Sequence, residues 1–515
     1  MTERKKSTPK CSAAAAVGIA VPSWVVLALA LALACSAVLT LTGCASPAGI
    51  APGAVMLAPS QAGLPAAATG LPAQSVEPAV PADWWRAYGD PQLTALVERA
   101  VADSPGLRGA QARVERALAA AATVQAGSGL QVNGAADVTR QRFSATSIYP
   151  PPLGGSIRTL VNAQVGVGWE FDFFGRNGAA LAAAVGAGRA AQAEVQAARN
   201  VLASNVARSY GQLARLFEQR AITERALKQR DEMLALIRQR VQAGLDTAVE
   251  LRQGEGALPE ARLQIAQIDE QITLNRHALA ALTAQPPQAL DTLVVAPVAA
   301  PAPTAAPAVV GALGDWMALP THLPADLLSR RADITAARWR IEAAVSDVAS
   351  ARAAFYPNIN LMAFAGLASI GLDRLINAGS EQYGAGPAIR LPIFDAGRLR
   401  ANLRGKVSDL DAAVESYNAA VLDAVHETAD PISTLRAMAQ QQREQALAQA
   451  ATEAAYDLAL QRFRAGLSTF LVVLNAEGGV LNQRRLAVDL RARVWDAQIA
   501  LIRALGGGYA TPGPV

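Results

Sequence analysis

The stretch that decides the fold is IRTLVNAQVGVGWEFDFFGR, residues 157–176. From Ile157 to Phe173, apolar side chains occupy most odd-numbered positions, and polar residues or glycine occupy most even-numbered ones. This alternation is the spacing of a β-strand with one apolar face. The strand extends over about seventeen residues, far beyond the usual five or six. A Phe-Phe-Gly-Arg turn then ends it.

The same alternation recurs in three other segments. Residues 130–139 precede the first strand across a turn rich in Pro and Gly, and residues 359–367 and 383–393 form a second pair. Long strands with one apolar and one weakly polar face are typical of a transmembrane barrel, whereas a β-sandwich with one wet face is the alternative. Two hairpins cannot close a barrel, and lipid does not tolerate open sheet edges. We therefore expect several copies of the chain to build one barrel.

A long helical segment with coiled-coil spacing follows each hairpin. Its apolar positions are Val195, Leu202, Val206, Leu213 and Phe217 in the first half, and Leu399, Leu403, Val407, Leu410, Val414, Tyr417, Val421 and Val425 in the second. About 65 residues in a helix span roughly 100 Å, and these segments are too polar to enter a bilayer. Each reverses at an Ala-Gly-Leu turn and returns as an antiparallel helix to about Leu282 or Leu505. A solvated helical bundle would leave the hairpins unexplained.

The chain contains one duplicated unit. Arg113 matches Arg340 at an offset of 227 residues, with Leu107, Val114 and Glu115 matching Ile334, Ile341 and Glu342, and residues 240–247 match residues 462–469 at an offset of 222. Phe174-Gly175-Arg176 also matches Phe394, Gly397 and Arg398. Three ordered matches at nearly constant offset favour a single duplication over a short repeat. We expect one unit over 83–295, a Pro/Ala-rich linker over 296–310, a second unit over 311–506 and a tail over 507–515.

The N-terminus carries a leader. Four basic residues precede a long apolar run that ends in Leu41-Thr42-Gly43-Cys44, the pattern of a bacterial lipoprotein signal peptide over residues 1–43. Cleavage would leave Cys44 as the first mature residue, bearing covalent diacylglycerol and an N-acyl chain such as palmitate. A transmembrane anchor over Ala13–Leu41 is the alternative. Residues 44–82, rich in Ala, Pro and Gly, are expected to be a lipidated flexible tether.

Composition excludes several functions. The leader, with four basic residues against one acid, accounts for three of the four net positive charges, so the mature chain offers no electrostatic case for nucleic acid. Only Cys44 lies outside the leader among the three cysteines, and His277, His322 and His426 have no partners at ligand spacing. We expect no enzyme activity, no metal and no cofactor.

The ordered motifs of the chain resemble the outer-membrane factor family, the TolC-like exit ducts, and within it the lipoprotein NodT/OprM-like branch. The residues that carry the resemblance are Trp84-Trp85, Asp90-Pro91-Gln92-Leu93, residues 169–176, Leu323-Pro324-Ala325-Asp326-Leu327-Leu328, Arg330-Arg331-Ala332-Asp333-Ile334, Phe355-Tyr356-Pro357 and residues 391–398. Single motifs among them are weak, and their shared order is specific. Trp84-Trp85 is expected to be a packing anchor.

The resemblance implies a fold and a function. Four strands from each of three chains would form a twelve-stranded barrel in the bacterial outer membrane, continued by helices as a periplasmic tunnel. The homotrimer would be the exit duct of a tripartite efflux pump, passing drugs or other small molecules, with a periplasmic membrane-fusion adaptor and an inner-membrane pump as partners. A lipid-anchored periplasmic coiled-coil adaptor without a pore is the alternative function. Ala45 implies sorting to the outer membrane.

The resemblance also implies that the helix reversals form the periplasmic tip, over residues 240–253 and 462–475. The expected tip, gate and adaptor-contact residues are Arg240, Gly244, Leu245, Asp246, Glu250, Arg462, Gly466, Leu467 and Asn475. Relatives commonly carry acids six and nine positions after the second glycine, where this chain has Val472 and Asn475. Glu250, six positions after Gly244, would supply a replacement ring of three carboxylates that attracts cations.

Three further departures concern this tip and its helices. Phe463 replaces a common tyrosine, and Pro259 and Pro431 fall inside expected helices. An interior proline removes a helix hydrogen bond and costs about 3 kcal/mol. We therefore expect a kink near Pro431.

Overall fold

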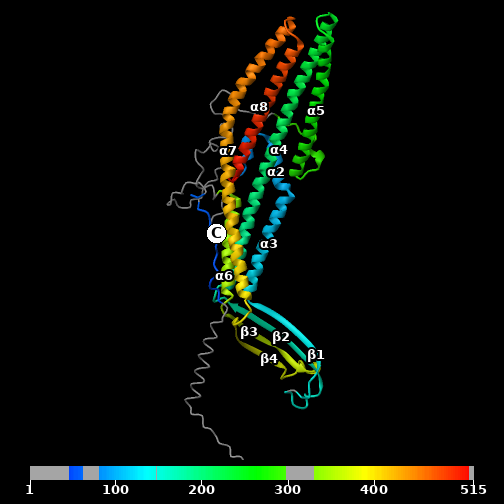
Figure 1. The fold of residues 1–515 in the computed structure, drawn as a ribbon. Helices are drawn as coiled ribbons and strands as arrows, with labels where there is room; N and C mark the ends of the chain where they lie inside the picture. Colours follow the sequence, from blue (N-terminus) through cyan, green and yellow to red (C-terminus); the bar gives the residue numbers. More distant parts are fainter. Residues whose placement is uncertain (1–45, 59, 62–79, 147, 297–329, 510–515) are drawn as a thin grey trace, which may run out of the picture.

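The computed structural model describes residues 46–58, 60–61, 80–146, 148–296 and 330–509. The molecule is long, with a small sheet at one end and two helical hairpins reaching to the other (Figure 1). The expected signal peptide, Cys44, most of the 296–310 linker and His322 lie outside the described residues.

One antiparallel sheet joins the two repeats. Its strands, in spatial order, are β1 (Gln131–Arg142), β2 (Ile157–Phe171), β3 (Asn358–Ile370) and β4 (Glu381–Arg390). The central pair β2–β3 unites the hairpins, with Phe171 opposite Ile359. In the single chain β1 and β4 are therefore edge strands. The fourth strand was predicted over residues 383–393, but it ends at Arg390. Pro392, which follows closely, has no N–H to donate to a β-ladder.

The register separates two faces of the sheet. Pairing places Val132 opposite Val167, Val167 opposite Ala363, and Ala363 opposite Ala385 on one face. This apolar face also carries Val138, Val161, Val165, Trp169, Phe171, Ile359, Leu361, Tyr383 and Ile389. The opposite face carries Asn133, Asp137, Asn162, Gln164, Glu170, Asn360 and Gln382. The predicted alternation is confirmed in β1, β2 and β4, whereas in β3 the second face also carries the apolar residues Met362, Phe364 and Ile370.

Helices make up the remainder of the rod. They are α2 (Pro91–Asp103), α3 (Pro105–Ser128), α4 (Arg176–Gln242), α5 (Ala248–Leu282), α6 (Ala332–Ala353), α7 (Arg398–Arg464) and α8 (Phe470–Ala504). Helix α4 packs along α3, α5, α6 and α8, and α7 packs along α6 and α8. Both 67-residue helices were predicted, and neither α5 nor α7 ends at its internal proline. Among the described helices none is long and apolar enough to span a membrane.

A repeated aspartate motif turns each hairpin into its long helix. The Asp172 carboxylate accepts hydrogen bonds from the backbone N–H groups of Asn177 and Gly178 at 3.1 and 2.7 Å. Asp395 does the same for Leu399 at 2.7 Å, and its neighbour Gly397 has φ 87°. These carboxylates satisfy N–H groups that the first helical turn leaves unpaired. The segments 171–176 and 394–398, each of which ends in Gly-Arg, are therefore strand-to-helix caps.

The predicted tryptophan anchor is confirmed. Trp84 and Trp85 are 1% and 4% exposed and belong to the main core cluster. Close by in sequence, Asp90 caps α2 and accepts the Tyr210 hydroxyl at 2.5 Å. This bond fastens the start of the folded unit to the middle of α4.

Part of the expected tether is fixed to the helices. Asp411 on α7 accepts hydrogen bonds from the N–H groups of Gly53 and Ala54, both at 3.0 Å. Asn418, also on α7, accepts from the Leu57 N–H at 2.7 Å and donates to the Val55 carbonyl at 3.0 Å. The prediction of a flexible tether is therefore wrong for residues 46–58. Small side chains let this backbone approach α7 closely enough to use its polar side chains.

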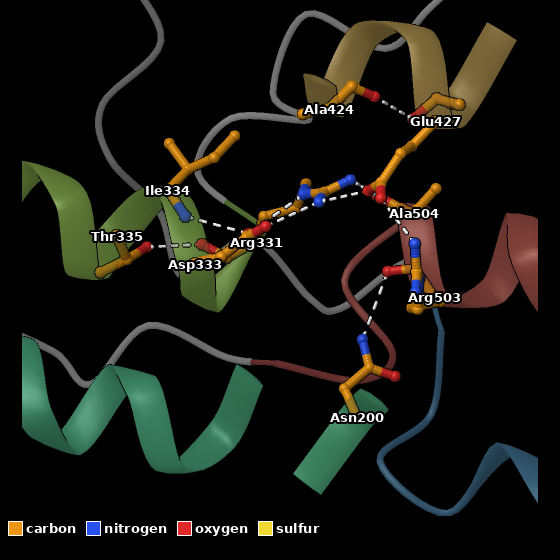
Figure 2. A network of polar contacts seen from close by, with 10 residues as sticks. Asn200, Arg331, Asp333, Ile334, Thr335, Ala424, Glu427, Arg503 and Ala504 are labelled. Atoms are coloured by element: carbon orange, nitrogen blue, oxygen red, sulfur yellow. Dashed lines mark hydrogen bonds and ion pairs between the residues drawn. The ribbon is translucent and has the colours of Figure 1, made fainter. Parts of the chain in front are cut away.

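A polar junction binds the middle of the rod (Figure 2). Arg331, whose side chain is 7% exposed, donates to Asp333 at 2.6 Å and to Glu427 on α7 at 2.7 Å. Arg503, near the end of α8, donates to the other Glu427 oxygen at 2.5 Å. Burial lowers the pKa of Arg331, but its hydrogen bonds to Asp333 and Glu427 outweigh this and raise it. One buried arginine thus joins the start of α6, the middle of α7 and the end of α8.

We expect Arg331→Ala to destabilise the protein by about 3 kcal/mol, because it leaves Asp333 without its cation and Glu427 with Arg503 alone. Thermal unfolding followed by circular dichroism measures the loss. The matched control is Arg338→Ala, because Arg338 is 70% exposed and pairs only with Glu342 on its own helix. Equal transitions for both variants would contradict a structural role for the junction.

Candidate functional site at the two helix reversals

The candidate site is the end of the rod farthest from the sheet, where α4 turns into α5 and α7 turns into α8 (Figure 1). Both turns use the same local structure. Gly244 and Gly466 have φ of 71° and 77°, a left-handed conformation that glycine adopts without strain. The following leucines, Leu245 and Leu467, donate their N–H groups to the carbonyls of Arg240 and Arg462, both at 2.8 Å. The shared Ala-Gly-Leu sequence is thus a helix C-cap of the Schellman type.

Arg240 organises the first turn. Its guanidinium donates to both carboxylate oxygens of Asp246 at 2.8 and 3.1 Å, and this pairing raises the pKa of Arg240. The same group lies 4.7 Å above the ring of Phe463 and donates to the Phe463 carbonyl at 3.4 Å. Phe463 belongs to the other hairpin and is fully buried. The Asp246 side chain is 9% exposed. It orients the guanidinium of Arg240, which joins the two turns.

Glu250 caps the start of α5. Its carboxylate accepts from the Thr247 N–H at 3.0 Å and from the Thr247 hydroxyl, while the Val249 N–H donates to that hydroxyl at 3.2 Å. This reciprocal pattern is a capping box. The hydrogen bond from the Thr247 hydroxyl, assisted by backbone N–H groups, lowers the pKa of Glu250. Glu250 therefore carries its negative charge at neutral pH.

The second turn has the opposite charge. Its cap residue Thr469 makes no side-chain cap, and no acid occupies the first turn of α8. Arg462 and Arg464 are exposed in the last turn of α7, and Asn475 and Val472 are exposed on α8. The predicted site residues are thus at one end of the molecule, but the acids lie on the first hairpin only. The side chains of Arg462 and Asn475 form no polar contact with the other predicted residues within the described chain.

An apolar cluster locks the two hairpins together just behind the turns. It consists of Ile237 on α4, Phe463 on α7, and Phe470 and Val473 on α8. The rings of Phe463 and Phe470 lie 6.1 Å apart. The phenylalanine that replaces the expected tyrosine is therefore a core residue.

A buried ion pair lies deeper between the hairpins. Arg230 on α4 donates to Glu477 on α8 at 3.1 Å and to the Ala257 carbonyl on α5 at 3.1 Å. The two side chains are 13% and 9% exposed. Burial raises the pKa of Glu477, and Arg230 opposes that rise. Sequence reasoning missed this pair, although Glu477 continues the apolar spacing of Phe470, Val473 and Val480, where a charged residue is unusual.

This region is a polar and apolar junction between the two hairpins. It offers charged groups, two exposed leucines that are 67% and 70% exposed, and inter-hairpin contacts that hold the turns together. No group of His, Cys, Asp or Glu in the described ranges is arranged to hold a metal ion.

Comparison with known proteins places this geometry among membrane channels. The model of the family described as outer membrane efflux protein matches residues 96–285 and 323–507. The putative multidrug resistance outer membrane protein MdtQ of Escherichia coli K12 is 32% identical over 455 residues, covering 85% of this chain and 92% of that protein. MdtP of the same organism, a multidrug resistance outer membrane protein, is 34% identical, covering 84% and 88%.

Solved structures agree. The outer membrane protein VceC of Vibrio cholerae superposes with a TM-score of 0.75 at 34% identity, covering 83% of this chain and 99% of that one. The outer-membrane channel OprN gives a TM-score of 0.75 at 27% identity, covering 90% and 97%.

We expect Arg230→Gln to destabilise the protein by about 3 kcal/mol at pH 8 and by less at pH 5. Without Arg230 the pKa of buried Glu477 rises further, so the folded state holds a proton that the unfolded chain loses above about pH 4.3. The stability of the variant therefore falls as the pH rises from about 4.3 towards the raised pKa of Glu477. Thermal unfolding at the two pH values measures the difference.

Arg252→Gln is the matched control, because Arg252 is 81% exposed and pairs only with Glu255 on its own helix. It should unfold like the parent at both pH values. A loss for Arg230→Gln that is the same at pH 5 and pH 8 would show that Glu477 does not titrate in this interval.

Proposed function

The chain belongs to the outer membrane efflux protein family, and we propose that three copies form one continuous passage, the outer-membrane exit duct of a tripartite efflux pump. Three four-stranded sheets would supply twelve strands to a single barrel. The helices would continue this barrel as a tunnel through the periplasm. We assign the protein a transport role without catalysis.

The observation that carries this function is the sheet. It has an apolar face, a polar face and two strands without outer neighbours in the single chain. In a bilayer such edges leave N–H and C=O groups unpaired, at several kcal/mol each. A closed barrel of several copies pairs every edge, directs the apolar face to lipid and encloses the polar face around water.

The helices support the second half of the passage. Helices α4 and α7, each of 67 residues, extend roughly 100 Å from the sheet to the turns. The turns would then form the periplasmic tip. We propose that Leu245 and Leu467, exposed beyond the last ion pairs, contact a periplasmic adaptor, and that an inner-membrane pump supplies the energy.

We propose drugs or similar small molecules as the exported class, because the relatives MdtQ and MdtP are described as multidrug resistance proteins. A lipid on Cys44 would hold the N-terminus at the outer membrane. Residues 46–58 support this arrangement, since Arg400, in the first turn of α7 next to the sheet, donates to the carbonyls of Ser46 and Ala48. Cys44 would then lie near the membrane end of the rod.

The alternative, a lipid-anchored adaptor without a pore, accounts for the helical hairpins alone. It gives no reason for a membrane-length sheet whose apolar face is exposed, or for the pairing of hairpins from both repeats in that sheet. The sheet therefore favours the duct.

Planar bilayers containing the purified trimer test the passage and its gate. We expect small cation-selective conductance steps, and we expect Glu250→Gln to weaken the selectivity because it removes three charges at the tip. Glutamine retains the capping-box geometry, so the turn should stay folded. Single-channel reversal potentials in a salt gradient give the selectivity.

Glu255→Gln, on another face of α5, controls for the loss of any carboxylate from this helix and should leave the selectivity unchanged. If Glu250→Gln leaves the selectivity of the trimer unchanged, the gate does not lie at the first turn. If the purified protein forms no trimer, the duct function is contradicted and the adaptor function is favoured instead.

A further inference from the structure

The two edge strands of the sheet are matched to each other. Strand β1 has twelve residues and β4 has ten, and they run in opposite directions at the two ends of the sheet. If copies close a barrel, as the proposed function requires, β4 of one copy pairs with β1 of the next in an antiparallel ladder. The register of that seam specifies which residue of β4 lies opposite which residue of β1, and the fold of a single chain does not determine it.

Two conditions restrict the register. A shift by one residue would turn the apolar face of β4 onto the polar face of β1, so only shifts by two are permitted. All ten residues of β4 should also lie opposite a residue of β1, because an unpaired N–H or C=O group in lipid is costly, although Pro387 has no N–H to donate. Two registers meet both conditions: Glu381 opposite Arg142, or Glu381 opposite Arg140.

Charge is complementary in both registers. Arg140 and Arg142 are exposed on the apolar-face side of β1 and form no ion pair with any described residue. Glu381 lies on the same face of β4, at the same end of the sheet, and is exposed. One of its oxygens accepts from the Gly379 N–H at 3.0 Å, and the other is available. Tyr383, next on this face, is 84% exposed.

In the first of these registers, with Glu381 opposite Arg142, all of these groups take part in contacts across the seam. With Glu381 opposite Arg142, the ring of Tyr383 comes opposite Arg140, which permits a cation–π contact. Ile389 then lies opposite Gly134, and Ala385 opposite Val138, so a larger side chain meets a smaller one at these two positions. The other register leaves Arg142 beyond the end of β4.

We propose that β4 of one copy pairs with β1 of a second copy of this chain in the register that sets Glu381 against Arg142 and Tyr383 against Arg140. The pair and the ring contact clamp the rim of the barrel at the hairpin-turn end, the end remote from the helices. The partner is therefore an identical chain, recognised through backbone pairing and through opposite charge at one rim.

Disulfide formation tests the register directly. Residues directly opposite across a ladder lie about 4.5–5.5 Å apart at Cα, which a disulfide spans, whereas diagonal neighbours at about 7–8 Å are too far. Val138→Cys with Ala385→Cys should give covalent dimers and trimers on oxidation of membranes from cells that express the full chain. Ala136→Cys with Ala385→Cys, which reports the other register, should give few. The single variants control for Cys44.

Charge reversal tests the clamp. Glu381→Arg should lower by several degrees the temperature at which the trimer dissociates in detergent. Combining it with Arg140→Glu and Arg142→Glu should restore that temperature. Arg374→Glu, at the same end of the sheet but away from either edge strand, is the control and should change nothing.

Each outcome decides the proposal. Cross-linking through Ala136 instead of Val138, or through neither in a conducting trimer, would overturn the register while leaving the duct intact. If the arginines bind phosphate groups of anionic lipid instead of Glu381, reversal at Glu381 would not weaken the trimer and the triple variant would not recover. Absence of a trimer in the unmodified protein would contradict the proposed function itself.

Discussion

The need to pair every backbone N–H and C=O group within the bilayer determines the architecture of this protein. Four strands in the order β1–β2–β3–β4 satisfy the inner ladders, but they leave one side of β1 and one side of β4 open in a single chain. In water such edges would be solvated, whereas in lipid they demand another strand. The oligomer is thus a consequence of a hydrogen-bond requirement, and its helices are arranged around the axis that the barrel sets.

The duplication solves a related problem of geometry. Each repeat supplies one hairpin and one long helical pair, and the two hairpins meet at β2–β3 within the chain. Polar contacts then fasten the repeats at two heights along the rod: Arg230 with Glu477 near the tip, and Arg240 with Phe463 at the turns. Removing one partner from such contacts strands a charge in a poorly solvated place, which makes them strong constraints on the relative position of the hairpins.

The tips of the two repeats share a backbone turn but differ in their charges. The Schellman turn is common to both because its geometry depends only on the positive φ of Gly244 and Gly466. The electrostatics differ, since Asp246 and Glu250 are engaged by Arg240 and Thr247 in the first turn, and the second turn carries exposed arginines. A threefold assembly would therefore present alternating acidic and basic turns around the tip.

The sequence by itself determined the strands, the long helices, the reversals and the duplication, because period-two and heptad patterns, glycines and caps act over a few residues. It identified Glu250 as an acid at the tip, but the capping box that holds its carboxylate depends on the backbone of Thr247. Only the tertiary structure decided that Asp246 serves Arg240, that Arg230 meets Glu477 across 247 positions of chain, and that residues 46–58 lie along α7. The last two contacts join segments remote in sequence and the first crosses a turn, and no local periodicity records which charge or backbone group a side chain will meet once the chain has folded.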